Sequence, residues 1–399
     1  MQKFKRVVVI VIDSVGIGSM PDAKRFNDEG ANTIVHTAEA VGGLKLPVME
    51  SLGYGNLADI KGVKKVKDHK NSYVTKLLEM SNGKDTMTGH WEMMGIYTTT
   101  PFITFTDTGF PDALIKELEE KSGYKIIGNK AASGTEIIKE LGEEQMRDNS
   151  LIVYTSADSV LQIAAHEEVT GLDELYRVCE IAREICLRPE YLVGRIIARP
   201  FVGTNKDNFK RTPNRHDLAL SPSEDTVMNV LKENEYMVSC IGKIADIFNN
   251  SGVTKTQKTV SNVDGMNKTI EEVKNADYNG LIYVNLVEFD SEYGHRRNPK
   301  GYAEAMETFD KQLGELLEVS SEDDLIIVTA DHGNDPTWHG TDHTREMVPF
   351  IAYSKALKNG RVLENRESFA DIGATILKNF NLSKPSHLIG STINEILED

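Results

Sequence analysis

The sequence predicts an α/β fold, with a doubly wound core sheet and a second α/β domain inserted into it. Strand-length apolar runs recur along the chain, and segments with helical spacing of apolar residues lie between them. The runs are continuous rather than alternating, which is typical of strands buried on both faces in a sheet covered by helices. A long middle segment lacks the chemical motifs of the two ends, and this predicts the insertion.

Four apolar runs end in an aspartate and are the predicted strands that matter most. They are RVVVIVID, LIVYTSAD, LIYVNLVEFD and DLIIVTAD, which end at Asp13, Asp158, Asp290 and Asp331. In an open α/β sheet, ligands bind beyond the carboxyl ends of the strands. We therefore expect Asp13, Asp290 and Asp331 to converge, although a single aspartate at such a position is more often a turn or capping residue.

Helical patterns separate these runs. In residues 301–319, apolar side chains recur at the spacing of one helix face. Residues 111–123 begin at Pro111 and end at Gly123, which is the usual order of helix start and stop signals.

Composition limits the classes of partner. The 399 residues carry a formal net charge of -16, which disfavours a nucleic acid or an anionic membrane as the main partner. No apolar stretch is long enough to span a bilayer, and the basic, apolar start is too short for a signal peptide. Three cysteines without a disulfide framework are typical of the cytoplasm. Cys179 and Cys186 lie seven residues apart in a helical pattern, so we expect shared burial. No protein partner is inferred.

Residues 329–350, TADHGNDPTWHGTDHTREMVPF, concentrate aspartate and histidine after a predicted strand, in a chain with only 10 histidines. Glycine and proline exclude regular structure there, so the segment is predicted to be a loop that directs polar side chains at a ligand. FDSEYGHRR adds a second such loop. Together they give a set of three aspartates and three histidines: Asp13, Asp290, His295, Asp331, His332 and His343. Such a set can hold two divalent cations, and it suits Mn²⁺, Zn²⁺ or Fe²⁺ better than Ca²⁺, while Mg²⁺ also fits.

Residues 81–95, SNGKDTMTGHWEMMG, supply a candidate nucleophile. The pattern predicts a loop that enters a helix, where free backbone N–H groups favour an anion. A threonine hydroxyl there becomes nucleophilic if a bound cation stabilises its alkoxide. Thr86 or Thr88 could equally be a helix cap, and His90 could be a ligand, a phosphate contact or a packed polar residue.

Taken together, these motifs resemble the bacterial-type phosphopentomutase family of the alkaline phosphatase superfamily, over essentially the whole chain. The matching segments are VIDSVGIGSMPDA, GKDTMTGHWE, GNKAASGTEII, YTSADSVLQIAAHEE, RIIARPFVG, RTPNRHDLAL, GKIADIF, FDSEYGHRR and TADHGNDPTWHGTDHTRE. The resemblance implies an alkaline-phosphatase-like core sheet and interconversion of ribose 1-phosphate and ribose 5-phosphate, or of the 2-deoxyribose equivalents.

The resemblance also implies a set of roles. Thr86 would be the phosphorylated nucleophile, and the cofactors would be two Mn²⁺ ions with a sugar bisphosphate such as glucose 1,6-bisphosphate as activator. The first metal would be held by Asp13, Asp331 and His332, with Thr86 or its phosphate completing the shell. The second would be held by Asp290, His295 and His343. His339 has no implied role, and its place in the cluster suggests only a supporting contact.

The middle of the chain is predicted to be an inserted cap domain of residues 102–216, with residues 1–101 and 217–399 forming the metal-binding core. The end of the segment is locally basic. The resemblance implies that Arg195 and Arg211 contact the phosphate that is not transferred, and that Asp158 accepts a hydrogen bond from a sugar hydroxyl. A cap that excludes water would keep a phosphorylated enzyme from hydrolysing its phosphate.

Two other classes of protein share parts of this pattern. A metal-dependent phosphatase or phosphodiesterase with the same core would release inorganic phosphate rather than an isomer. A non-catalytic phosphate- or metal-binding protein would be expected to lack a ligand or the nucleophile, and none is missing. A cofactor-independent phosphoglycerate mutase should carry serine as its nucleophile, so Thr86 disfavours that activity.

Overall fold

The computed structural model describes residues 2–156 and 158–399, which form two compact units. The first, named below the core unit, comprises the chain up to residue 99 and residues 221–399. The second, the inserted unit, comprises residues 100–220. The sequence had placed these boundaries after residues 101 and 216.

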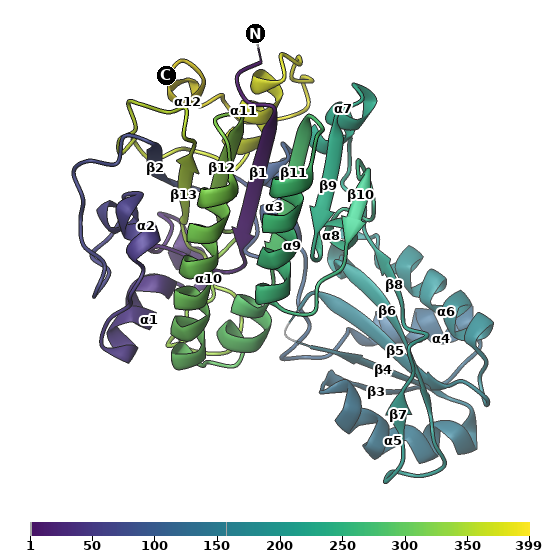
Figure 1. Ribbon diagram of the computed structural model, residues 1–399. Coiled ribbons are helices and arrows are strands. Elements are labelled where there is room, and N and C mark those ends of the chain that lie inside the picture. Colours follow the sequence, from purple (N-terminus) through teal and green to yellow (C-terminus); the bar gives the residue numbers. More distant parts are fainter. Residues whose placement is uncertain (1, 157) are drawn as a thin grey trace. The chain divides into compact units, whose positions relative to one another are not determined.

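The core unit is built on a seven-stranded sheet in the order β10-β9-β11-β1-β12-β13-β2 (Figure 1). The strands are β1 (Arg6–Ile12), β2 (Ser72–Leu77), β9 (Met237–Ile241), β10 (Lys255–Gln257), β11 (Gly280–Leu286), β12 (Asp324–Thr329) and β13 (Val348–Tyr353). The five strands from β10 to β12 are parallel, and β13 runs antiparallel to both of its neighbours. The predicted parallel sheet is therefore confirmed from β10 to β12, and the sequence pattern did not reveal that β13, which lies between β12 and the edge strand β2, is antiparallel.

Helices cover both faces of this sheet, as the doubly wound fold requires (Figure 1). One layer contains α1 (Thr33–Val41), α2 (Pro47–Ser51), α9 (Asn262–Asn275) and α10 (Pro299–Val319). The other contains α3 (Thr86–Met93), α7 (Val227–Glu233), α8 (Ile244–Ile247) and α11 (Asp371–Asn379). Shorter turns are η1 (Ala23–Phe26), η2 (Tyr54–Asn56), η4 (Phe289–Gly294) and α12 (Asn394–Leu397). The helix predicted over 301–319 is α10, and its apolar face, including Met306, Phe309 and Leu313, is buried.

Three of the four aspartate-terminated runs form β1, β11 and β12, which lie side by side with β1 in the middle. Every residue of β11 and β12 is buried, which explains their continuous apolar pattern. β11 ends at Leu286, however, and Asp290 lies beyond it in the π-helical turn η4. The fourth run forms β4 of a different sheet.

The inserted unit contains a six-stranded mixed sheet in the order β3-β4-β5-β6-β7, with β8 also paired to β6. Its strands are β3 (Ile126–Ala131), β4 (Leu151–Thr155), β5 (Val160–His166), β6 (Arg195–Val202), β7 (Lys210–Arg211) and β8 (His216–Ala219). Its helices are α4 (Asp112–Ser122), α5 (Gly134–Asp148), α6 (Leu172–Ile185) and the 3₁₀ turn η3 (Pro189–Tyr191). Helices α4 and α6 pack on one face and α5 packs on the other.

Two predictions for the inserted unit, the ends of α4 and the burial of two cysteines, are confirmed. Pro111 is the N-cap of α4, and Gly123 ends it with a left-handed φ of 81°, which glycine adopts without strain. Cys179 and Cys186 are both free thiols buried in the core that α4 and α6 share, as expected from their spacing.

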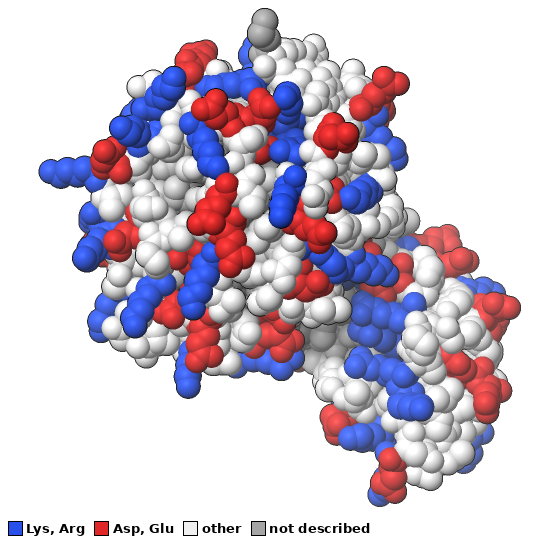
Figure 2. Space-filling model, viewed as in Figure 1, with Lys and Arg blue, Asp and Glu red and all other residues white. Residues whose placement is uncertain are grey.

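Surface charge is mixed on the core unit. Figure 2 shows acidic and basic side chains interspersed over the face of the core unit that it displays. On the inserted unit, basic side chains gather in the area where Figure 1 draws the strands of its sheet. Within the described residues, we find no helix with the length and apolar character needed to cross a membrane.

Candidate metal centre and nucleophile

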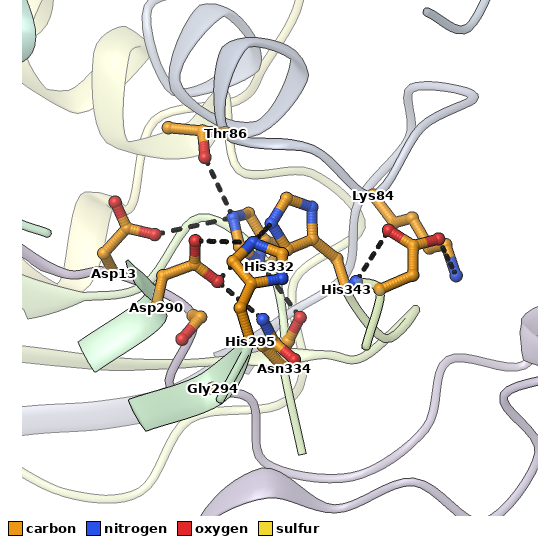
Figure 3. A network of polar contacts seen from close by, with 12 residues as sticks. Asp13, Lys84, Thr86, Asp290, Gly294, His295, His332, Asn334 and His343 are labelled. Atoms are coloured by element: carbon orange, nitrogen blue, oxygen red, sulfur yellow. Dashed lines mark hydrogen bonds and ion pairs between the residues drawn. The ribbon is translucent and has the colours of Figure 1, made fainter. Parts of the chain in front are cut away.

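The carboxyl ends of β1, β11 and β12 bring the predicted aspartates together in the core unit. Figure 3 shows two of them, Asp13 and Asp290, beside the histidines. Asp13 directly follows β1, Asp331 follows β12, and Asp290 lies in η4. All three are buried, and Asp290, the most exposed of them, retains only 6% of its accessible surface. The predicted convergence is confirmed.

The first group of side chains consists of Asp13, Asp331 and His332. The three offer ligand atoms that all lie within 4.8 Å of one another. His332 Nε2 lies 3.5 Å from Asp13 Oδ1 and 3.4 Å from Asp331 Oδ2. This group is named below the first site.

The second group consists of Asp290, His295 and His343. His295 Nε2 lies 3.1 Å from Asp290 Oδ2, and His343 Nε2 lies 3.4 Å from Asp290 Oδ1. The two Nε2 atoms are 3.0 Å apart. The rings of His332 and His343 lie with their centroids 4.0 Å apart, so this second site adjoins the first.

Amide groups orient the carboxylates. Asn285 Nδ2 donates to Asp13 Oδ2 at 2.7 Å, and the backbone N–H of Ser14 donates to Asp331 Oδ1 at 3.0 Å. The other oxygens of these two carboxylates, Asp13 Oδ1 and Asp331 Oδ2, are buried without a hydrogen-bond partner in the described residues. Asn334 Nδ2 donates to Asp290 Oδ1 at 2.7 Å. Buried carboxylate oxygens without a donor are costly in a protein alone, but they are suitable ligands for a cation.

Backbone carbonyls fix the tautomers of two imidazoles. His332 Nδ1 lies 3.0 Å from Gly333 O, and His295 Nδ1 lies 2.6 Å from Thr341 O. Because a carbonyl only accepts, each Nδ1 carries the hydrogen and each Nε2 keeps its lone pair for a ligand. This arrangement is typical of metal-binding histidines.

The charges of the two sites interact strongly. Burial and the nearby Asp331 and Asp290 raise the pKa of Asp13 well above its usual range. Burial would raise the pKa of Asp290 too, but His295 and His343 outweigh it and hold this pKa well below its usual range. Burial, opposed in part by Asp331, lowers the pKa of His332 and so favours the neutral ligand form. The donor set, its orphaned oxygens and its fixed tautomers therefore fit divalent cations at both sites.

Thr86 is the first residue of α3, and its Oγ1 lies 3.2 Å from His332 Nε2 (Figure 3). Asp85 is the N-cap of the helix and accepts hydrogen bonds from the backbone N–H and the hydroxyl of Thr88, at 3.0 and 2.6 Å. The Thr88 hydroxyl is buried and used in capping. Of the two candidate threonines, Thr86 is therefore the one whose hydroxyl lies beside the first site.

Gly89 and His90 allow α3 to pack closely against the segment that carries Asp331. A Cβ atom on Gly89 would lie 2.1 Å from the carbonyl oxygen of Asp331, so only glycine allows this approach. His90 is fully buried, with Nδ1 2.8 Å from Thr86 O and 3.1 Å from Asp331 Oδ2. Of the three roles left open for His90, the geometry supports a packed polar residue behind Thr86 and Asp331.

Two basic side chains, Lys84 and Arg345, hold the loop of Thr86 against the loop of His343, and no sequence pattern pointed to either. Lys84 Nζ lies 3.0 Å from Asp28 and 3.1 Å from Asp342, whose other oxygen accepts from the N–H of His343 at 2.8 Å (Figure 3). Arg345 is buried, and its Nη1 donates to Gly83 O at 2.5 Å. The amides Asn285 and Asn334 were missed as well, because an isolated asparagine carries no recognisable pattern.

His339 lies away from both sites. Its Nε2 is 2.9 Å from the backbone oxygen of Asn27, and His339 belongs to neither group of ligands. The supporting contact expected of its side chain is therefore not seen, because the imidazole contacts Asn27 instead.

The remaining predicted residues lie in the inserted unit. Asp158 follows β4, and its carbonyl accepts from the N–H of Val160. Arg195 begins β6 and is paired with Val160, whereas Arg211 lies in β7, paired with Phe201 near the other end of β6. The backbones of the two arginines are thus separated by roughly 20 Å along the strand.

Taken together, the α/β core and its paired carboxylate and imidazole groups define a metal-dependent enzyme. A family model described as the metalloenzyme superfamily matches residues 5–384, and the chain belongs to this superfamily. This match supports the alkaline-phosphatase-like fold predicted from the sequence.

Solved structures resemble this chain over nearly its whole length. A phosphoglycerate mutase from Leishmania mexicana is 13% identical, with a TM-score of 0.52, and the match covers 98% of this chain and 97% of that one. A protein from Pyrococcus horikoshii is 14% identical, with a TM-score of 0.50 and coverage of 98% and 100%. A protein of the alkaline phosphatase superfamily from Vibrio parahaemolyticus is 13% identical, with a TM-score of 0.47 and coverage of 98% and 70%. At these identities the first two matches show the fold.

Proposed function

We propose that the protein is a phosphopentomutase that interconverts ribose 1-phosphate and ribose 5-phosphate, and the 2-deoxyribose equivalents. The observation that carries the proposal is the position of Thr86. Its hydroxyl lies at the start of α3, 3.2 Å from His332 Nε2 and beside two adjacent groups of metal-binding side chains. A hydroxyl in this position is suited to accept and return a phosphoryl group.

In the proposed reaction, phosphorylated Thr86 donates its phosphoryl group to the free hydroxyl of the pentose phosphate. The bond between Thr86 Oγ1 and phosphorus breaks as the bond to the sugar oxygen forms. The resulting pentose bisphosphate reorients, and Thr86 attacks its other phosphate to give the isomer and restore the phosphorylated enzyme. Bound divalent cations supply positive charge that stabilises the Thr86 oxygen and the transferring phosphoryl group.

Asp13, Asp331 and His332 would hold one cation, and Asp290, His295 and His343 the other. Manganese is proposed from the family resemblance, and Mg²⁺ or another divalent metal also fits the donors. The structures of the Leishmania mexicana phosphoglycerate mutase were determined at low cobalt concentration, which is consistent with a divalent metal in this fold. Glucose 1,6-bisphosphate is proposed as the activator that first phosphorylates Thr86.

The inserted unit is proposed to separate mutase from phosphatase activity. A phosphorylated Thr86 open to water would lose its phosphate, so the pentose bisphosphate must be retained while it turns. We propose that Arg211 contacts the phosphate that is not transferred, and that Asp158 accepts a hydrogen bond from a sugar hydroxyl. The resemblance implies the same phosphate contact for Arg195, but its backbone lies roughly 20 Å from that of Arg211 along the strand, too far for both to hold one phosphate group. Guanidinium groups suit this role because their paired donors match phosphate oxygens.

The decisive experiment supplies ribose 1-phosphate, Mn²⁺ and a trace of glucose 1,6-bisphosphate, and measures ribose 5-phosphate and inorganic phosphate in the same reaction. The proposal predicts that the isomer is the main product and that its formation depends on the bisphosphate. Inorganic phosphate as the main product would instead establish a phosphatase. A parallel reaction with 3-phosphoglycerate tests the activity of the structural neighbour, and turnover of that substrate alone would reject the pentose assignment.

A further inference from the structure

One face of the inserted sheet carries side chains that neither the metal sites nor Thr86 uses. Tyr154 of β4 and Phe201 of β6 pack in the same apolar cluster as Ile137 and Ile138 of α5. Side chains alternate between the faces of a strand, so Arg199, two residues before Phe201, lies on this same face. Arg211 is paired with Phe201 and shares the face as well.

The Tyr154 hydroxyl points at the beginning of α5. Tyr154 is 1% exposed, yet its hydroxyl has no hydrogen-bond partner among the described residues. A Cβ atom on Gly134, the first residue of α5, would lie 2.7 Å from this hydroxyl and 3.3 Å from Arg211 Nη1. The hydroxyl, the guanidinium group and the helix N-terminus therefore converge on one point, where Gly134 contributes no side chain.

Positive charge collects at this point, although Asp217, which pairs with Arg215, offsets part of it. Arg211 and Arg199 have no acidic partner within ion-pair distance among residues 2–156 and 158–399, whereas Arg215 pairs with Asp217. Arg199 is half-buried, and its Nε donates only to the neutral Gln162, at 3.0 Å. Burial, followed by the nearby Arg215, lowers the pKa of Arg199, so a nearby negative charge would stabilise its guanidinium group.

Burial also raises the pKa of Tyr154, although Arg199, Arg211 and Arg215 oppose the rise. Arg199 thus lies near the hydroxyl, but no hydrogen bond of normal geometry satisfies it. The hydroxyl keeps its proton at neutral pH and is available as a donor to an anion.

The N-terminus of α5 adds further donors. The helix spans 15 residues, and its N-cap residue Ser133 makes no side-chain hydrogen bond to the helix. The Ser133 hydroxyl instead lies 3.0 Å from that of Thr135. Free N–H groups of a first helical turn, together with the helix dipole, favour an oxyanion.

We infer that Tyr154, Arg199, Arg211 and the N-terminus of α5 form an oxyanion site, and that its ligand is the phosphate group of a sugar phosphate. This ligand rests on the proposed function, in which the site holds the phosphate that is not transferred. The Tyr154 hydroxyl and the N–H groups of α5 are uncharged donors with fixed directions. They distinguish the site from a surface that is only basic. Tyr154, Arg199 and Gly134 thereby gain roles that the sequence motifs alone do not assign.

Binding without turnover tests the inference. The full-length, Mn²⁺-loaded Thr86→Ala variant is titrated with ribose 5-phosphate by calorimetry, alone and with each further substitution. We expect Arg211→Gln to weaken binding about tenfold or more and Tyr154→Phe about threefold or more, because charged donors contribute more than neutral ones. Gly134→Ala should weaken binding too, since its methyl group fills the convergence point. Lys210→Gln is the matched control: the same charge is lost from the adjacent residue of β7, which is exposed like Arg211 but whose side chain points to the opposite face.

A second titration uses inorganic phosphate as the probe. A loss of affinity for both ligands shows that the site recognises phosphate alone, and a loss for ribose 5-phosphate only shows that the sugar must be attached. Unchanged affinities in Arg211→Gln and Tyr154→Phe, or losses no larger than in Lys210→Gln, overturn the inference. Failure of the proposed function is a separate result, namely no isomerisation by the parent protein, and it leaves these binding constants interpretable.

Discussion

The core unit and the inserted unit have opposite charge imbalances at their polar centres. In the core unit, three buried aspartates converge, and oxygens of Asp13 and Asp331 have no donor. In the inserted unit, Arg199 and Arg211 face a buried tyrosine hydroxyl that is also unpartnered. Each fold tolerates the imbalance because a ligand of the opposite charge can offset it. The core is therefore suited to cations and phosphoryl transfer, and the inserted unit to recognition of an anion.

The largest effect should come from Thr86, where the chemistry of the core unit is concentrated. Thr86→Ala removes the only oxygen proposed to carry the phosphoryl group, so isomerisation should fall about 10³-fold or more. The Mn²⁺ content should not change, because the aspartates and histidines remain. Steady-state assays and metal analysis on one preparation check both statements. Thr88→Ala is the control and should retain far more activity, since the Thr88 hydroxyl bonds Asp85.

The metal sites come next. His343→Ala removes one of three donors at the second site, and we expect the Mn²⁺ concentration for half-maximal activity to rise about 100-fold or more, because even residues that only support metal ligands contribute 10- to 100-fold. His339→Ala, in the same loop, should bind Mn²⁺ normally because His339 bonds Asn27. Equal metal affinity in the two variants would contradict the assignment of His343.

Replacing a residue that only orients a metal ligand should lower the affinity for Mn²⁺ less than replacing the ligand itself. Asn285→Ala removes the hydrogen bond to Asp13 Oδ2, so the affinity for Mn²⁺ should fall about tenfold while the stoichiometry is kept. The exposed Asn267, whose side chain contacts Gln312 on the helix layer, supplies the comparison variant Asn267→Ala. A tenfold loss in both variants would indicate a general loss of stability and not an effect on Asp13.

Substitutions in the inserted unit should change how much phosphate is released to water more than they change metal binding or the transfer step at Thr86. Arg211→Ala is expected to lower productive sugar binding about tenfold, since a charged hydrogen bond contributes about 1.5–3 kcal/mol and about 1.4 kcal/mol corresponds to tenfold. The ratio of inorganic phosphate released to pentose isomerised should rise, with Mn²⁺ content unchanged. Both products are measured from one ribose 1-phosphate reaction, beside Lys210→Ala. A parallel fall in both products would show that Arg211 does not protect the phosphorylated enzyme.

The two units also differ in what their sequences predict. In the core, continuous apolar runs predicted β1, β11 and β12, and the aspartate after each run predicted the metal sites, because strand ends in a parallel sheet share one edge. The turn η4 was not predicted, since nothing in its composition shows that Asp290 lies in a π-helical turn four residues beyond the strand. The antiparallel direction of β13 was hidden because a buried strand has the same apolar pattern whether it runs parallel or antiparallel to its neighbours.

In the inserted unit, sequence patterns predicted single elements such as α4. They did not predict which strands pair or which side chains come into contact. The site at α5 depends on the register that pairs Arg211 with Phe201 and on the missing Cβ of Gly134. Tyr154 gave no signal, because a tyrosine in an apolar strand usually packs in a core. Asn285 and Asn334 were missed in the core for a similar reason, because their importance comes only from the carboxylates they contact.

The most direct test of the central claim is the transfer of labelled phosphate from glucose 1,6-bisphosphate to the Mn²⁺-loaded protein, followed by peptide mapping. We expect close to one phosphate per chain, carried on Thr86, and loss of labelling after metal removal or in Thr86→Ala. No labelling of the metal-loaded parent, or a label on Thr88 or any other residue, would contradict it.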